Sequence, residues 1–431
     1  MPQVKPFSAV TFRHDEGPDI TPFVAPPYDV ISPEMRGGLL GNDPHNIVVI
    51  DLPEGDADAA VPGNRYQRAG DIWRAWRDQR ILVDDASPAI YVLEQVWEHA
   101  GRHVRRRAFV ASVELHDFAE GVILPHERTL PNAITDRLHL TRACAANLSP
   151  VFGMFTDPAG ETDTIYDEAM AGAEMLEATD AAGVVSRVWA LRNAEIIGSL
   201  TALLAGKQIF IADGHHRYTT ALAYRNERRA ADAAAGSSPE SPQYDYVLMA
   251  LVNMDDPDVV VLPTHRLARA ADTFDEQRFW DGLTRHFDLT EPFGGHPAAA
   301  LASSTRPAFI IKTAGGTVRL ASLRADVDPA TAIPGSASSA WKNLDVTILQ
   351  ELILYPQFGI HPDDPSTLDR LSFVKDAHEA LQVRGADVAF VMNPTRMDQL
   401  RAVALGGETM PQKSTYFYPK LLTGLLFRAM D

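Results

Sequence analysis

Five consecutive residues in the middle of the chain could bind a phosphate group: Asp213, Gly214, His215, His216 and Arg217. They follow a short apolar run and precede a segment rich in alanine, leucine and arginine, which predicts a strand, a tight turn and a helix. The first backbone N–H groups of a helix attract anions, and a glycine lets the main chain approach a ligand closely. An arginine can donate two parallel hydrogen bonds to phosphate oxygens. The loop is therefore the first candidate for a phosphate site.

Asp213 has several alternative roles in such a loop. It could orient a histidine, accept a proton from a substrate or hold Mg²⁺ beside the phosphates. The simplest alternative is a helix-capping residue, with both histidines merely polar. Five site-type residues in a row after a buried strand favour the functional interpretation. A zinc site is less favoured, because adjacent residues on a helix point about 100° apart and rarely reach one metal ion.

A second group of residues combines a base, an acid and a cation at the end of an apolar run: His126, Glu127 and Arg128. Glu127 is the candidate general base, since that role needs a carboxylate close to a substrate hydroxyl. Further polar residues follow and would share one face of a helix: Asp136, Arg137 and Thr141. For this helical face, a surface salt-bridge network is an equally good explanation.

Two more segments contain residues that suit a ligand. A lysine, a serine and a threonine follow one another from Lys413, so Lys413 joins Arg128 as a candidate cation for a phosphate. The aromatic residues after this triplet could stack on a base, although anchoring of the tail is the favoured explanation. Near the N-terminus, two prolines hold Tyr28 and Asp29 in a rigid turn, which could present them to a site or could be ordinary loop structure.

The composition limits the class of protein. The formal net charge is -18, and an acidic surface repels nucleic-acid phosphates, so nucleic acid is not expected as a partner. The arginine-rich stretch 102–107 is expected to form the solvated face of a strand. Cys144 is the single cysteine, which excludes an internal disulfide, and its small apolar neighbours indicate a core thiol. Without a signal-peptide pattern or an apolar run of roughly 20 residues, we expect a soluble, cytoplasmic protein.

The elements that would position these residues alternate between strands and helices, so the expected fold class is mixed α/β. Apolar residues at helical spacing between Tyr66 and Trp76 predict a helix, and the apolar run 46–50 predicts a buried strand. Segments 90–94 and 108–113 predict a hairpin. Further strands are expected at 208–212, 246–252, 259–262, 308–312, 317–321 and 388–392, and helices at 194–204 and 216–229.

The length of the chain favours more than one domain. We expect an N-terminal α/β domain over 1–155, a second domain over 156–290 that contains the Asp213–Arg217 loop, and a C-terminal α/β region over 291–431. The tail from residue 344 is expected to be mainly helical.

Several short blocks together resemble one bacterial family, known as domain of unknown function 1015. The blocks lie at 24–32, 124–129, 146–150, 212–218, 251–256, 262–266 and 410–420. The resemblance covers nearly the whole chain, and the block from Met410 to Gly424 is highly specific. The family label implies no activity.

The loop on its own also resembles the phosphate-binding turn of the ParB/sulfiredoxin-like superfamily, and it looks most like that of the free L-serine kinases. In those kinases the loop contacts nucleotide phosphates and a separate carboxylate acts as the base. The resemblance implies a phosphate role for Gly214, His215, His216 and Arg217, and a catalytic or metal role for Asp213. The chain departs from that superfamily in its greater length, in the lack of an evident DNA-binding region, and in having its cysteine far from the loop.

We therefore expect a ParB/sulfiredoxin-like phosphate-binding unit embedded in a larger, multi-part α/β chain. Its expected function is transfer of a phosphate from ATP or ADP, with Mg²⁺, to a small hydroxyl metabolite, of which free L-serine is the most specific candidate. Asp213, His216 and Glu127 would be catalytic, and Arg128 and Lys413 would add cations. The alternatives are a non-catalytic nucleotide- or metabolite-binding regulatory protein and a phosphatase-type hydrolase of phosphorylated metabolites. A homodimer is a possible assembly.

Overall fold

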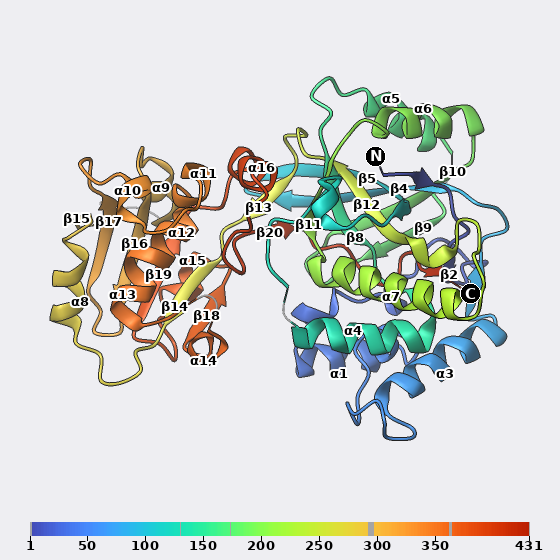
Figure 1. The fold of residues 1–431 in the computed structure, drawn as a ribbon, viewed down its shortest axis with the longest axis horizontal. Helices are drawn as coiled ribbons and strands as arrows, with labels where there is room; N and C mark the ends of the chain where they lie inside the picture. The colour runs from blue at the N-terminus through green and yellow to red at the C-terminus, as the bar shows by residue number, and fades with distance from the viewer. Residues whose placement is uncertain (1, 130, 173, 292–296, 362–363, 431) are drawn as a thin grey trace. The chain divides into compact units, whose positions relative to one another are not determined.

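The computed structural model describes residues 2–129, 131–172, 174–291, 297–361 and 364–430, and the chain folds into two compact units (Figure 1). The first unit comprises Met1–Pro125, Thr129–Val259 and Pro419–Asp431. The second unit comprises His126–Arg128 and Val260–Tyr418. Among the described residues, no helix is both long and apolar enough to cross a membrane.

The first unit is built on one large mixed sheet, which confirms the mixed α/β class. Its strands, in spatial order, are β6 (Ile123–Leu124), β11 (Ile209–Asp213), β8 (Val151–Phe155), β12 (Tyr246–Asn253), β5 (Arg102–Glu114), β4 (Ile90–His99), β10 (Val185–Leu191) and β9 (Leu176–Thr179), with β1 (Val4–Lys5) beside β5. β12 is parallel to β8 and β11 is parallel to β6, whereas the other neighbours are antiparallel. Short pairs of strands complete the unit: β2 (Val10–Phe12) with β3 (Leu82–Asp84), and β7 (Ala146–Asn147) with β21 (Arg428–Ala429).

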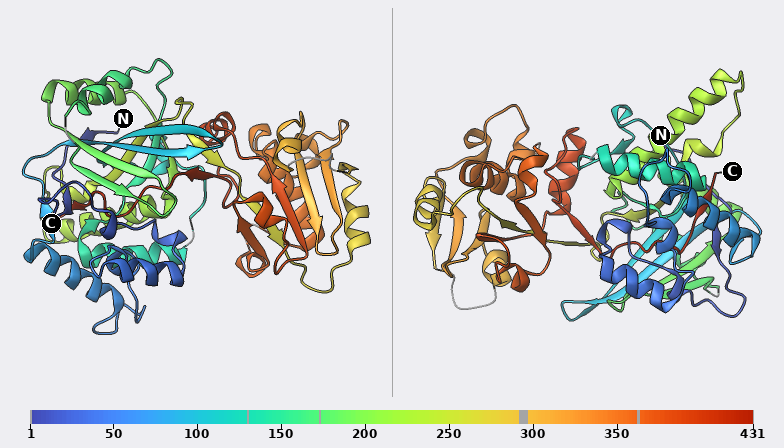
Figure 2. Two further views of the ribbon diagram at one scale, coloured as in Figure 1. Left: turned by 180° about the vertical axis from the view of Figure 1, so that it is seen from behind. Right: turned by 90° about the horizontal axis from the view of Figure 1, so that it is seen from below.

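Helices cover this sheet on both sides. α4 (Pro131–Cys144) and α7 (His215–Ala234) lie next to each other below the sheet in Figure 1, and α5 (Thr162–Ala169) and α6 (Ala194–Leu204) lie above it. The view from behind in Figure 2 shows α3 (Arg65–Asp78) on the same side as α4. The remaining helical segments of the unit are η1 (Thr21–Phe23), η2 (Tyr28–Val30), α1 (Pro33–Asn42), α2 (Val48–Asp51), η3 (Phe118–Glu120) and η4 (Gln243–Asp245).

The second unit has its own sheet and its own apolar core. The strands, in spatial order, are β15 (Phe287–Thr290), β17 (Val318–Leu323), β16 (Ala308–Thr313), β19 (Val388–Met392), β14 (His265–Ala268) and β18 (Leu371–Val374), and β13 (Val260–Leu262) pairs with β20 (Tyr416–Tyr418). The helices are α8 (Glu276–Leu283), α9 (Pro297–Ala302), α10 (Pro329–Ala332), α11 (Ser339–Lys342), α12 (Asp345–Leu349), the π-helix η5 (Gln350–Leu354), α13 (Tyr355–Phe358), α14 (Pro365–Leu368), α15 (Ala377–Ala380) and α16 (Met397–Leu405). The core includes Leu301, Ile310 and Val391.

Most of the expected elements are present, including the helix around Trp73, the β4–β5 hairpin and the β16–β17 hairpin. The strand expected at 46–50 is wrong, because this segment forms the helical turn α2. The side-chain oxygen of Asn46 accepts a hydrogen bond from the Val48 N–H at 3.0 Å and so starts the turn. A short, fully buried apolar run has no periodicity that distinguishes a strand from a helical turn.

The arginine-rich stretch is a strand, as expected, but only part of it is solvated. In β5, Arg102 and Arg105 are exposed, whereas Arg106 and Arg107 are buried. The expectation of a solvated face is therefore wrong for these two residues.

The two units also differ from the three expected domains. The first unit joins β8, which lies at the end of the expected domain 1–155, to β11 and β12 from the expected domain 156–290. It also takes in the last residues of the chain, from Pro419 onward.

Candidate functional site

The loop at Asp213 forms a tight turn between a buried strand and a long helix, as its sequence predicts. β11 ends at Asp213, Gly214 has a φ of 88°, and α7 begins at His215. This φ lies in the left-handed region that glycine tolerates best. A Cβ atom at position 214 would also lie 2.9 Å from the guanidinium carbon of Arg217. Both the turn and the close approach of Arg217 therefore require the glycine.

Asp213 lies between two cations of the first unit. Its Oδ2 atom pairs with Nη2 of Arg217 at 2.6 Å, and its Oδ1 atom accepts a hydrogen bond from Nζ of Lys420. Burial alone would raise the pKa of Asp213, but the charges of Lys420 and Arg217 hold that pKa well below its ordinary value. The carboxylate thus stays ionised and fixes both cations, which makes Asp213 poorly suited to accept a proton. Because both of its carboxylate oxygens contact cations, Asp213 is also not suited to serve as a Mg²⁺ ligand.

A third cation, Arg106, acts on the same carboxylate. The Arg106 side chain is buried in β5, where Nη2 donates to the Pro419 carbonyl oxygen at 2.5 Å and also to Gln95. Burial lowers the pKa of Arg106 to about 9, against the opposing effect of the Asp213 charge. Arg217 and Lys420 thus contact Asp213 at the start of α7, and Arg106 adds a third positive charge that acts on the same carboxylate. This local excess of positive charge, in a chain of net charge -18, suits a bound anion.

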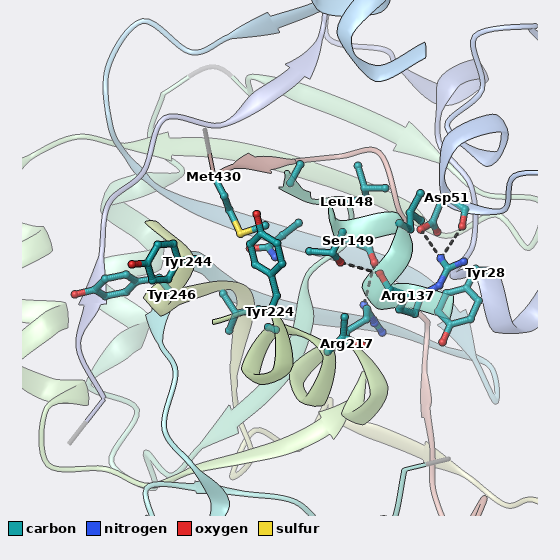
Figure 3. A pocket seen from close by; sticks show the side chains of 17 residues that line it. Tyr28, Asp51, Arg137, Leu148, Ser149, Arg217, Tyr224, Tyr244, Tyr246 and Met430 are labelled. Carbon is teal, nitrogen blue, oxygen red and sulfur yellow. Dashed lines mark hydrogen bonds and ion pairs between the residues drawn. The ribbon is translucent and has the colours of Figure 1, made fainter. Parts of the chain in front are cut away.

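Arg217 also lines a pocket between two helices of the first unit (Figure 3). From α7 the lining residues are Arg217, Thr220, Ala221 and Tyr224, and from α4 they are Arg137, Leu140 and Thr141. Spacings of three and four residues place each set on one helical face. The remaining wall consists of Tyr28, Asp51, residues 146–149, Tyr244, Tyr246, Val247 and Met430. Figure 3 shows Tyr244 and Tyr246 at one end, and Asp51, Arg137 and Tyr28 at the other.

The ionic end of the pocket is organised by Arg137. Its Nη1 atom lies 3.3 Å from Oδ1 of Asp51 and donates to the Asp51 carbonyl oxygen at 2.6 Å. Its Nη2 atom pairs with Oδ2 of Asp136 at 2.6 Å, and the Tyr28 ring centroid lies 4.1 Å from its guanidinium carbon. Burial raises the pKa of Tyr28 to about 12. Burial also raises the pKa of Asp51, although the charges of Arg137 and Arg217 oppose the shift.

Residues from separate sequence motifs therefore meet in the first unit. The pocket brings Tyr28 of the proline-containing turn, Arg137 and Thr141 of the polar helix face, and Arg217 of the loop to one place. Arg137 is buried, so the surface salt-bridge explanation does not hold for this residue. His215 is buried and His216 is partly exposed at the start of α7.

The other predicted site residues belong to the second unit. The Oε1 atom of Glu127 accepts a hydrogen bond from the backbone N–H of Lys413. Nε of Arg128 donates to Oγ1 of Thr409 at 3.3 Å, and Nε2 of His126 lies 2.9 Å from Oγ1 of Thr415. The structure thus brings Glu127 and Lys413 together within the second unit.

Sequence reasoning missed Asp51, Lys420 and Arg106. Lys420 lies in the distinctive C-terminal block, but its pairing with Asp213 joins residues 207 positions apart, which no local pattern shows. Asp51 follows the misassigned apolar run at 46–50. Among the described residues, no group of three or more histidines, cysteines and acidic residues is placed to hold a metal ion.

Comparisons with known proteins give a family and a few distant structures. The model of the family "Protein of unknown function (DUF1015)" matches residues 4–347. No curated protein matches the chain in sequence.

The solved structures that match are weakly similar. A free serine kinase mutant in complex with ADP has 10% identity and a TM-score of 0.33, and the match covers 72% of this chain and 87% of the kinase. A conserved hypothetical protein from Pyrococcus furiosus has 12% identity and a TM-score of 0.32, covering 73% and 92%. SbnI with a C-terminal truncation, from Staphylococcus aureus, has 11% identity and a TM-score of 0.34, covering 73% and 85%. Similarities at this level do not assign a function.

Proposed function

The chain belongs to the DUF1015 family, and for this member we propose a nucleotide-dependent phosphotransferase that acts on a small hydroxyl metabolite. The observation that carries the proposal is that Arg217 and Lys420 meet at Asp213, at the first turn of α7, with the charge of the buried Arg106 acting on the same carboxylate. Helix N–H groups and cations together favour a phosphate group. Free L-serine is the first acceptor to test.

In this proposal the loop binds the phosphates and positions the transferred group. Gly214, His215, His216 and Arg217 surround the phosphates, and Asp213 holds Arg217 in place. In phosphoryl transfer a protein acts mainly by positioning and by neutralising charge, and buried cations do both. His216 is partly exposed at the first turn of the helix, and we propose that it donates a hydrogen bond to a phosphate oxygen.

The remaining predicted residues keep supporting roles. Arg128 and Lys413 are proposed as additional cations for the nucleotide. Glu127 is one of two carboxylates proposed as the general base, and the other is Asp51 of the pocket wall. Because Asp213 does not fit a metal ligand, we propose that any Mg²⁺ enters bound to the nucleotide phosphates, and no step depends on it.

A non-catalytic regulatory protein is the second candidate. The observation that favours it is that Arg217 and Lys420 already pair with Asp213, so a nucleotide could bind and exchange these contacts without any transfer. Such a protein would bind a nucleotide and release neither phosphorylated product nor inorganic phosphate. A phosphatase-type hydrolase would instead release inorganic phosphate from a phosphorylated metabolite.

The deciding experiment measures nucleotide binding and turnover in wild type and in Arg217→Ala. Binding of ATP, ADP, CTP and GTP with Mg²⁺ is followed by calorimetry, and phosphorylated product is then sought with L-serine and other hydroxyl metabolites. We expect one nucleotide to bind to wild type and at least about tenfold more weakly to Arg217→Ala, since a charge-assisted contact contributes about 1.5–3 kcal/mol. Arg384→Ala, at an exposed arginine of the second unit, is the matched control and should bind normally. Equal binding by Arg217→Ala and wild type would contradict the phosphate site.

A further inference from the structure

Arg217 interacts with two carboxylates whose surroundings differ: the partly buried Asp213 and the buried Asp51. Asp213 has a cation on each oxygen, one of them the Arg217 nitrogen at 2.6 Å. Asp51 is 3% exposed, and its side-chain contacts are longer, at 3.3 Å to Arg137 and 3.3 Å to Oγ1 of Thr423. Accordingly the pKa of Asp213 is lowered and the pKa of Asp51 is raised. When two carboxyl groups in one site have pKa values shifted in opposite directions, one typically stays ionised as a fixed charge and the other accepts a proton.

The pocket that contains Asp51 has room and unused hydrogen-bonding capacity beside Arg217. Thr220 lines it from α7 and is 3% exposed, and its Oγ1 atom forms no hydrogen bond within the part of the chain that the structure describes. A buried hydroxyl without a partner costs stability unless a bound molecule supplies one. The hydroxyl of Ser149, 3.5 Å from Nη1 of Arg217, lies on the same wall.

From these contacts we propose that the pocket between α4 and α7 binds the phosphate acceptor and that Asp51 accepts the proton of the acceptor hydroxyl. The proposal rests on the proposed phosphotransferase function. Arg217 belongs both to the phosphate loop and to the pocket wall, so a molecule in the pocket lies next to a phosphate bound at the loop.

The charges around the pocket indicate the class of acceptor. Arg137 already pairs with two carboxylates, Asp51 and Asp136, and Arg217 pairs with Asp213. The charge of Arg137 is therefore balanced, and the positive charge of Arg217 and Lys420 is assigned to the nucleotide phosphate, so neither is left for an anionic acceptor. The pocket suits a small hydroxyl compound without net negative charge, which includes neutral and zwitterionic molecules.

The acceptor hydroxyl oxygen forms a bond to the terminal phosphorus of the nucleotide, and its proton passes to a carboxylate oxygen of Asp51. The bond between that phosphorus and the bridging oxygen breaks, and its electron pair leaves with a nucleotide that is one phosphate shorter. Asp51 returns the proton to solvent after the product leaves.

The charged and titratable groups that face Asp51 set the direction of its pH dependence. They are Arg137 and Cys144 of α4, Arg217 of α7, and Tyr28 and Asp29 of η2. The arginines favour the ionised carboxylate, whereas burial and Asp29 oppose ionisation. Turnover should therefore fall on acidification, at a pH above the usual range for an aspartate, because the base is active only when deprotonated.

The first test compares Asp51→Asn with Glu127→Gln in the full chain. We expect Asp51→Asn to bind the nucleotide within about twofold of wild type and to lose turnover by about 100-fold or more, the usual contribution of a general base. The little activity that remains should lack the acidic fall, whereas Glu127→Gln should keep it. An unchanged pH profile in Asp51→Asn, or loss of the acidic fall in Glu127→Gln alone, would overturn the assignment of Asp51. If wild type neither binds nor turns over any nucleotide, the proposed function itself fails.

The second test uses Thr220→Val, which does not disturb a buried ion pair. We expect the KM for the acceptor to rise about tenfold at unchanged nucleotide affinity, because the bound acceptor loses a hydrogen bond. If the acceptor does not use this hydroxyl, the variant will be more stable than wild type and its KM will be unchanged, which would overturn the pocket assignment. This result decides the question even if Asp51→Asn fails to fold.

Discussion

At the scale of single residues, the loop combines backbone geometry with charge. Gly214 supplies a φ of 88° and leaves space for the Arg217 guanidinium, which in turn is held by Asp213. The aspartate and arginine are four positions apart, so the first turn of α7 brings them together. Because this contact lies within the five-residue motif, the sequence alone indicates this part of the candidate site.

We predict that Gly214→Ala destabilises the first unit by about 2–4 kcal/mol. This is the sum of the cost of a strained φ at an alanine and the cost of displacing the Arg217 side chain. The measurement is urea-induced unfolding, together with nucleotide affinity, which should fall. Gly236→Ala is the matched control, since Gly236 has a φ of 68° but no atom within 4 Å of a built Cβ. It should show the backbone strain alone, of about 1 kcal/mol. Equal losses in the two variants would mean that Arg217 does not need the space.

The ion pairs of Asp213 make a prediction about pH. Because the folded pKa is lowered, ionised Asp213 adds stability above its unfolded pKa of about 3.9, and this stability is lost as the pH falls toward the folded value. Asp213→Asn should therefore cost about 2–4 kcal/mol at pH 7. The difference from wild type should shrink below about pH 4.

The control for this prediction is Asp78→Asn, at an exposed position at the end of α3. Its free energy of unfolding should stay within about 0.5 kcal/mol of wild type at every pH. A constant difference between wild type and Asp213→Asn down to pH 3 would show that the ion pairs do not hold the pKa down.

At the scale of elements, the spacing of apolar residues predicted helices correctly. The burial of individual side chains could not be predicted from their neighbours in the sequence. Tyr66, Trp73 and Trp76 lie on the buried face of α3, as their spacing predicts. The apolar run at 46–50 became α2, since a buried run lacks the polar positions that would reveal its period. The buried Arg106 donates to Gln95, its cross-strand neighbour in the β4–β5 hairpin, and to the Pro419 carbonyl oxygen, which is 313 positions away in the sequence. The strand–turn–helix at the loop could be predicted, but the pocket could not, because it depends on how α4 packs against α7.

The contact between α3 and α4 gives a prediction at the same scale. A Cβ atom at Gly70 of α3 would lie 2.5 Å from the Ala143 carbonyl oxygen of α4. Gly70→Ala should therefore force the helices apart and cost about 1–3 kcal/mol. Gly198→Ala, in the exposed part of α6 with no atom within 4 Å, should instead stabilise by about 0.5–1 kcal/mol. Thermal and urea unfolding of the two variants should thus change in opposite directions, and a neutral Gly70→Ala would contradict the close packing.

At the scale of the whole molecule, the first unit is discontinuous in the sequence. Its last segment supplies Lys420 to Asp213, buries Leu421, Leu422 and Phe427, and pairs β21 with β7. The sequence marked this tail as a distinctive block but could not show that it divides between two units at Pro419. The three expected domains followed the order of the chain, whereas a sheet can pair strands from any part of it.

We predict that removal of residues 419–431 prevents the first unit from folding and leaves the second unit intact. The deletion takes away five buried apolar side chains, Leu421, Leu422, Leu425, Leu426 and Phe427. At about 1.5–3 kcal/mol each, their loss is comparable with the whole usual stability of a domain, about 5–15 kcal/mol. Hydrogen exchange followed by mass spectrometry should show protection lost in β5 and β12 and kept in β16 and β19, whose core is separate. Lys420→Gln in the full chain is the control: it should keep protection in β5 and β12 while weakening nucleotide binding, because it removes a charge without removing the apolar contacts. Protection of β5 and β12 in the truncated chain would show that the tail serves the ligand site alone and is not part of the core.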